Sequence, residues 1–105
     1  MRPADASVAL RIERVDAANV RVSGEIGFAN ASEGVARTNE VLGDKSDLTV
    51  DLRGLTRSDS ATLGVLLIWS AAAALRRVRL RFTNAPTGLM ALAHLCDAEP
   101  LLGLA

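Results

Sequence analysis

The segment from Ser60 to Leu75 constrains the fold of this chain more than any other, because it is long, apolar and free of proline. Asp59 and Ser60 stand directly before its apolar residues, where side-chain oxygens can accept hydrogen bonds from the unpaired N–H groups of a helix. These features predict a helix from about Ser60 to Leu75. Leu48–Leu52, shortly before it, has apolar residues at every second position, which predicts a strand leading into the helix.

Both sides of this predicted helix are apolar. At 100° per residue, one side contains Leu63, Leu66, Leu67, Ser70, Ala71 and Ala74, and the opposite side contains Ala61, Val65, Ile68, Trp69, Ala72 and Leu75. The first side is expected to pack on a sheet. A helix that is apolar all round is buried on both sides or meets another molecule, and a chain of 105 residues has little material to bury both. We therefore predict a partner surface on the second side, with Ser60 at its head; the apolar tail, Leu101–Leu104, is the alternative cover.

The remaining chain shows weaker but recognisable patterns. Alternating apolar residues predict three further strands, at Val8–Glu13, Val20–Val22 and Arg77–Phe82. The first two are expected to form a hairpin through the turn residues Asp16–Asn19. A weak helical pattern lies between Phe28 and Gly43, and a last helix is expected to start at Pro86 or Thr87, with Leu89, Leu92, Ala93 and Cys96 on its inner side.

The order of these elements predicts the architecture. Two strands separated by a helix-length crossover are expected to be parallel neighbours. The strands alternate apolar and polar residues, so helices are expected to cover one face of the sheet and water the other. Arg77, Arg79 and Arg81 are accordingly interpreted as a solvated strand face rather than a phosphate or lipid site. The prediction is one α/β domain over residues 1–105, with a mixed sheet of four or five strands and helices on one face.

Composition excludes several classes of function. Twelve basic residues balance 12 acidic ones, so nothing indicates bulk attraction to nucleic acid or anionic lipid. The longest nearly apolar stretch, Leu63–Leu75, is shorter than the roughly 20 residues that span a bilayer. No basic segment leads into an apolar one at the N-terminus, and the single Cys96 fits a reducing compartment. We therefore expect a cytoplasmic protein that does not insert into membranes.

No set of residues predicts catalysis. His94 and Cys96 are near each other in the sequence, but a Cys–His nucleophile needs a third orienting residue, and a metal site needs more ligands. The chain has no P-loop and no Gly-x-Gly-x-x-Gly sequence. The expectation is a protein that is not an enzyme, with no catalytic residues, metal or cofactor.

The residues around the predicted helix resemble a known family. The block Val50–Leu67, VDLRGLTRSDSATLGVLL, is similar to the signature of STAS domains (sulphate-transporter and anti-sigma-factor-antagonist domains). Asp51-Leu52, Asp59-Ser60 and Leu63-Gly64 occupy the places of the signature, and Val22–Ile26, VSGEI, resembles the end of the family's second strand. The resemblance covers nearly the whole chain and implies a STAS-like (SpoIIAA-like) fold without catalytic activity.

Within that family, the short chain and the apolar helix most resemble the stand-alone STAS subunit of Mla-type phospholipid ABC transporters. The resemblance implies an adaptor that binds and regulates the cytoplasmic ATPase and is peripheral to the inner membrane through that partner. The implied partner-binding residues are Asp59, Ser60, Ala61, Thr62, Val65, Ile68 and Trp69. The alternative branch is an anti-sigma-factor antagonist, which a kinase switches by phosphorylating Ser60.

Ser60 supports more than one interpretation. Ser60 or Asp59 caps the helix, which contributes about 0.5–2 kcal/mol and alone explains a single serine. Contact with a partner or phosphorylation at Ser60 is the functional interpretation. A phosphate would be favourable at the helix N-terminus but would place roughly −1.5 to −2 charges on an apolar surface, so it is expected to release a partner. A small hydrolase or nucleotide-binding enzyme is a third option, without an ordered catalytic set to support it.

Overall fold

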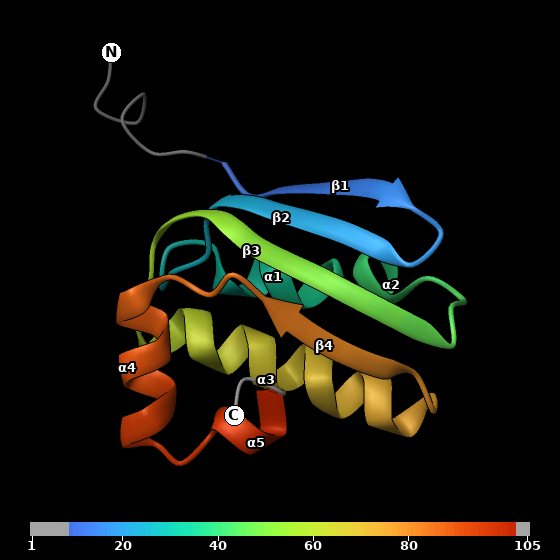
Figure 1. Ribbon diagram of the computed structural model, residues 1–105. Helices are drawn as coiled ribbons and strands as arrows, with labels where there is room; N and C mark the ends of the chain where they lie inside the picture. Colours follow the sequence, from blue (N-terminus) through green and yellow to red (C-terminus); the bar gives the residue numbers. More distant parts are fainter. Residues whose placement is uncertain (1–8, 103–105) are drawn as a thin grey trace.

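The computed structural model describes residues 9–102, which form a sheet of four strands with helices against one face (Figure 1). The strands are β1 (Arg11–Asp16), β2 (Asn19–Glu25), β3 (Asp47–Arg57) and β4 (Arg79–Thr83). The helices are α1 (Ala31–Ala36), α2 (Thr38–Leu42), α3 (Ser60–Leu75), α4 (Thr87–Leu95) and α5 (Glu99–Leu102). Val8, Gly103 and Leu104, which belong to the predicted first strand and tail, lie outside the described residues.

The sheet is mixed, as predicted. Its strand order is β1-β2-β3-β4, with β1 antiparallel to β2 and the other neighbours parallel. The hairpin between β1 and β2 and the parallel pair β3–β4 are both confirmed. In the parallel register Val50 is paired with Val20 on one side and with Phe82 on the other, so these three side chains form one buried row.

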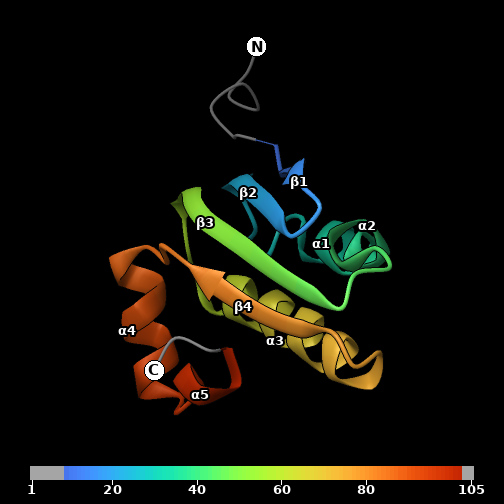
Figure 2. The same ribbon diagram turned by 45° about the vertical axis from the view of Figure 1, so that its right-hand side comes forward.

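In the part of the chain that the structure describes, all helices lie on one face of the sheet, which confirms the prediction from strand alternation (Figure 2). The open face is polar: Arg21 Nε lies 3.9 Å from Asp51 Oδ2, and Arg79 Nε lies 3.7 Å from Asp47 Oδ1. Two opposing effects act on the pKa of Asp51, and partial burial by itself would raise it. Hydrogen bonds from the Arg53 N–H (2.9 Å) and the Asn84 amide (3.1 Å) outweigh that effect, with help from the nearby arginines, and hold the pKa below its ordinary value.

Several element boundaries differ from the predictions. β3 does not end at Leu52 but continues to Arg57, because it pairs with β2 past a register shift that brings Gly54 opposite Ser23. β1 begins at Arg11, so Leu10, which the alternation places within the strand, precedes it. β4 begins at Arg79, because Arg77 has a φ of 59° and ends the preceding helix. In each case the deciding factor is a tertiary pairing or a chain reversal, which local alternation does not report.

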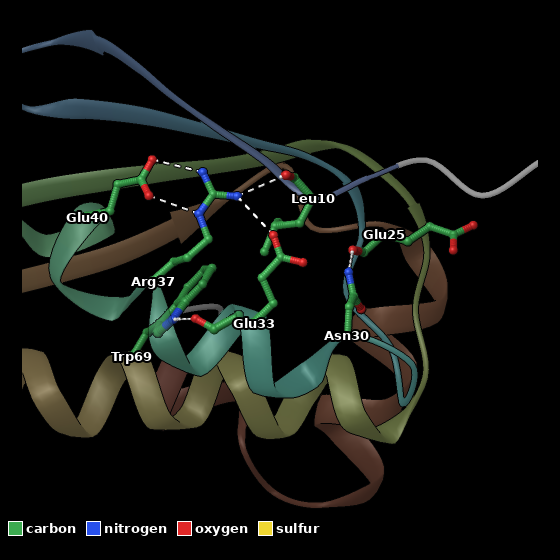
Figure 3. Close-up of polar contacts among 8 residues, drawn as sticks. Leu10, Glu25, Asn30, Glu33, Arg37, Glu40 and Trp69 are labelled. Carbon is green, nitrogen blue, oxygen red and sulfur yellow. Dashed lines mark hydrogen bonds and ion pairs between the residues drawn. The ribbon is translucent and has the colours of Figure 1, made fainter. Parts of the chain in front are cut away.

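The weak helical pattern between Phe28 and Gly43 corresponds to two short helices that meet at Arg37 (Figure 3). Arg37 forms a two-pronged pair with Glu40, both nitrogen–oxygen distances being 2.9 Å, and it also donates to the Leu10 carbonyl at 3.0 Å. The hydrogen bond and charge of Arg37 lower the pKa of Glu40. Arg37 thus ties the α1–α2 junction to the start of the first strand.

The C-terminal part packs as a cover over one flank of α3. In α4, Leu89 and Ala93 are buried as predicted, but Cys96 follows the helix and is exposed, so its assignment to the inner side is wrong. The tail folds back as α5, whose Leu102 is buried. Within residues 9–102 no helix combines the length and apolarity that crossing a bilayer requires.

Candidate functional site: the head and outer face of α3

The head of α3 is a capping box built by Asp59 and Thr62. Asp59 Oδ1 accepts from the N–H groups of Ala61 (2.8 Å) and Thr62 (3.1 Å), while the Thr62 hydroxyl accepts from the Asp59 N–H at 3.0 Å. The N–H groups of Ala61 and Thr62, which have no partner within the helix, and the N–H group of Asp59 before it thereby all have an acceptor. Of the two residues considered as caps, Asp59 is the one that caps the helix.

Thr62 also connects the helix head to the sheet. Its hydroxyl donates to the Ile26 carbonyl, just past the end of β2, and its side chain is fully buried. Thr62 is therefore not exposed in the isolated chain for the partner contact that the resemblance implies. A hydroxyl that is both donor and acceptor explains a threonine at this position, because valine of the same shape would leave both partners unpaired.

Ser60 is the first residue of α3 and is exposed. Because Asp59 provides the cap, the Ser60 hydroxyl is available to another molecule. The neighbouring backbone carries the partial positive charge of a helix N-terminus, which is a favourable setting for a phosphate or for an acceptor atom of a partner.

Val65 and Trp69 were expected on the outer side of α3, and that expectation is wrong. They are 2% and 0% exposed. The Trp69 indole N–H donates to the Gly34 carbonyl at 3.0 Å, so the ring lies between α3 and α1 (Figure 3). A Cβ on Gly34 would lie 3.0 Å from Val65 Cγ1, which shows how closely the two helices approach. Among residues 9–102, α1 is therefore the element that covers Trp69 and Val65, and part of the predicted tail lies outside the described residues.

Among residues 9–102, α1 and α2 occupy one flank of α3 and α4 and α5 the other (Figure 2), and they leave one apolar stripe of the helix uncovered. We call it the α3 stripe and define it as Ser60, Gly64, Ile68, Ala71 and Leu75, spaced by three or four residues. Ile68 is 45% exposed and Leu75 is 87% exposed. Ala61 and Asp59 are partly exposed at its upper end, so Asp59, Ser60, Ala61 and Ile68 stay predicted partner contacts.

Gly64 belongs to the block that resembles the STAS signature, and the sequence alone predicts no function for it. A Cβ built on it would meet no heavy atom within 4 Å, so the fold itself gives no reason for a glycine. Glycine inside a helix costs about 1 kcal/mol relative to alanine. A closely approaching partner explains the residue, because the missing side chain lets another backbone reach the helix.

A cavity of about 470 Å³ lies beside the helix head, between the β2–α1 loop and the end of β3. Phe28 forms part of its wall and is 77% exposed. Sequence reasoning missed this residue. The available signal was an aromatic residue in the Gly27–Asn30 turn region, where an internal packing role is uncommon.

The two residues considered for nucleophilic chemistry, His94 and Cys96, lie on α4 and directly after it. His94 Nδ1 lies 3.1 Å from a Glu99 oxygen on the exposed side of α4, and Cys96 is exposed. Among residues 9–102, no three His, Cys, Asp or Glu side chains are grouped closely enough to hold a metal ion. The arrangement around α3 provides contact surface and a capped helix end, which suit binding.

Two solved structures share this architecture. The anti-sigma factor antagonist SpoIIAA in its unphosphorylated form superimposes with a TM-score of 0.67 at 16% identity, over 89% of this chain and 84% of that chain. An anti-sigma factor antagonist from Mycobacterium paratuberculosis superimposes with a TM-score of 0.53 at 24% identity, over 92% of this chain and 95% of that chain. The chain therefore has the SpoIIAA-like α/β fold.

The family follows from the sequence. The family model described as "Mlab, STAS domain" matches residues 10–103. The chain belongs to the STAS domain family. No curated protein matches it.

Proposed function

We propose that this STAS domain is a non-catalytic adaptor that binds and regulates the cytoplasmic ATPase subunit of a bacterial phospholipid (Mla-type) ABC transporter. The helix that begins at Ser60 is the docking element, and its partner holds the protein at the inner membrane. The match to a family model described as Mlab supports the choice of partner.

The uncovered α3 stripe is the observation that carries this proposal. It is free of charge from Ser60 to Leu75, and Gly64, between Ser60 and Ile68, has open space beside it. An exposed apolar patch on a small domain commonly marks an interaction site. The Trp69–Gly34 hydrogen bond fixes α3 to α1, and the Thr62–Ile26 bond fixes it to the end of β2. The surface is therefore preorganised, and little conformational entropy is lost on docking.

Regulation follows from occupancy of this surface. If the ATPase binds the stripe more tightly in one of its conformational states than in the other, docking shifts its population toward that state. The size of the shift is set by the difference between the two affinities. We propose that the favoured state is the assembled or active one. Ser60, at the top of the stripe, is where an added charge would interfere most directly with docking.

Binding to the purified ATPase of the Mla-type transporter from the same organism tests the proposal. Ile68→Asp places a charge at the centre of the stripe and is expected to weaken binding about 30-fold or more. Val15→Asp is the matched control, because Val15 is 51% exposed but lies on the edge strand β1. Equal affinity of the wild type and Ile68→Asp, or no binding of the wild type, would contradict the proposal.

The alternative function is an anti-sigma-factor antagonist switched by phosphorylation. The exposed Ser60 hydroxyl at the helix head favours it, because a kinase needs an accessible acceptor. The test is incubation with ATP and a candidate anti-sigma-factor kinase from the same organism, followed by mass spectrometry. A phosphate on Ser60 that abolishes binding to that kinase supports the antagonist; binding to the ATPase without phosphorylation supports the adaptor.

A further inference from the structure

The cavity beside the helix head has one unusual wall. Phe28 is 77% exposed, whereas the chain's other two aromatic side chains, Trp69 and Phe82, are 0% and 3% exposed. The loop that carries Phe28 is fixed by Asn30, which accepts from the Gly27 N–H at 2.9 Å and donates to the Glu25 carbonyl at 2.8 Å. The phenyl ring is thus exposed on a loop that is hydrogen-bonded in place.

Three apolar residues, Ala9, Ile26 and Ala29, also line the cavity, and the charged part of its wall is mostly acidic. Glu25, Glu33 and Asp59 line the cavity, against the single basic residue Arg57. Glu33 is within 3.5 Å of Arg37, but the Glu25 side chain extends away from that cluster (Figure 3). Asp59 caps the helix with Oδ1, while Oδ2 is turned toward Gly27, 3.1 Å from where a Cβ would stand.

A lining hydroxyl also lacks a partner. The Ser58 Oγ has less than 1 Å² of exposed surface and no hydrogen bond to any other described residue. An unpaired buried polar atom costs about 1–3 kcal/mol. Because this oxygen has almost no exposed surface, a ligand in the cavity reaches it only if the Ser58 side chain turns, so the choice of ligand rests on Phe28 and the carboxylates.

These walls favour a guanidinium group. Its planar face stacks on an aromatic ring, its charge is attracted to the ring and to carboxylates, and its five N–H groups can reach several acceptors at once. An anion such as a phosphate would face the Glu25 and Asp59 carboxylates and be repelled. The cavity therefore selects a cationic, hydrogen-bond-donating group.

We propose that this cavity receives an arginine side chain of the protein that docks on the α3 stripe. The inference rests on the proposed function for the identity of that protein. It is argued from continuity, because Asp59 lines the cavity and the next residue, Ser60, begins the stripe. The stripe supplies apolar contact area, and the Phe28 cavity supplies a charged contact that fixes orientation.

Charge reversal in the complex is the first test. Glu25→Lys and Phe28→Ala are each expected to weaken binding of the purified Mla-type ATPase about tenfold or more. Glu13→Lys is the matched control on the open face of the sheet and is expected to change the affinity less than about twofold. Raising the salt concentration is expected to weaken the wild type more than Glu25→Gln. If the wild type binds and Ile68→Asp does not, unchanged affinity of Glu25→Lys and Phe28→Ala would overturn the inference while leaving the proposed function intact.

A second test does not require the partner. The isotopically labelled full chain is titrated with N-acetyl-arginine amide, and N-acetyl-norleucine amide serves as the uncharged control. The amide resonances of Gly27, Phe28 and Ser58 are expected to shift with the arginine compound only, and the shifts are expected to disappear in Glu25→Lys. Absence of localised shifts, or equal shifts with both compounds, would overturn the proposed arginine site whatever protein docks on α3.

Discussion

Replacing Gly64 by alanine is expected to stabilise the isolated domain, although Gly64 lies within its longest helix. The added Cβ meets no heavy atom within 4 Å, so no packing cost opposes the gain in helix propensity. That gain is about 0.8–1 kcal/mol. For a domain of this size, 1 kcal/mol corresponds to a rise in melting temperature of about 4–8 °C.

The same substitution at Gly54 is expected to have the opposite effect. A Cβ on Gly54 would lie 2.5 Å from Ser23 Cβ and 3.1 Å from Ser23 Cα on the neighbouring strand. Neither atom can move without shifting the β2 backbone, so a loss of about 2–3 kcal/mol is expected. Urea unfolding at pH 7, followed by Trp69 fluorescence, measures both variants. A destabilised Gly64→Ala variant, or a Gly54→Ala variant as stable as the wild type, would refute the argument that the space beside each glycine decides the effect of an added Cβ.

Three further perturbations test the internal contacts that hold α3 and the sheet. Thr62→Val is expected to lower the free energy of unfolding by about 2 kcal/mol, because it leaves the Ile26 carbonyl and the Asp59 N–H without the hydroxyl; Thr62→Ser, which keeps it, should lose less in the same urea titration. Trp69→Phe is expected to cost about 2 kcal/mol, measured by circular dichroism, through a small cavity and the lost bond to Gly34; an unchanged midpoint would contradict the burial of the indole. The lowered pKa of Asp51 stabilises the fold above the ordinary carboxyl pKa of about 3.9, and this contribution is lost as pH falls through the folded-state pKa. Asp51→Asn should therefore be less stable than the wild type at pH 7 and approach it as the pH falls through the folded-state pKa of Asp51; a difference independent of pH would argue against this source of stability.

The sequence predicted the parts of the fold that depend on local chemistry. Asp59 before an apolar run marked the start of α3, and the alternation at Leu48–Leu52 marked both the strand and its wet face. The extension of that strand to Arg57 was not predictable locally, because it depends on the pairing of Gly54 with Ser23. The break at Arg37 was missed for a similar reason: its hydrogen bond to the Leu10 carbonyl joins segments far apart in the chain.

The candidate site was predicted in part. Periodicity showed that α3 is apolar on all sides, but it could not show which neighbour covers each side. Trp69 was placed outside because α1 is short and weakly signalled, whereas the small Gly34 lets α1 approach α3 closely enough to bury the indole. Gly34 and Gly64 are both glycines within helices. Only the structure shows that Val65 fills the space beside Gly34, whereas the space beside Gly64 is empty.

Docking of the α3 stripe on the transporter ATPase is tested most directly by the affinity of Gly64→Arg. The long side chain would project from an open position, so the isolated domain is expected to remain folded with a melting temperature at or above that of the wild type. Its affinity for the ATPase is expected to fall about 100-fold or more, because the side chain occupies the space of the partner. A folded Gly64→Arg domain that binds the ATPase as tightly as the wild type would show that α3 is not the docking surface.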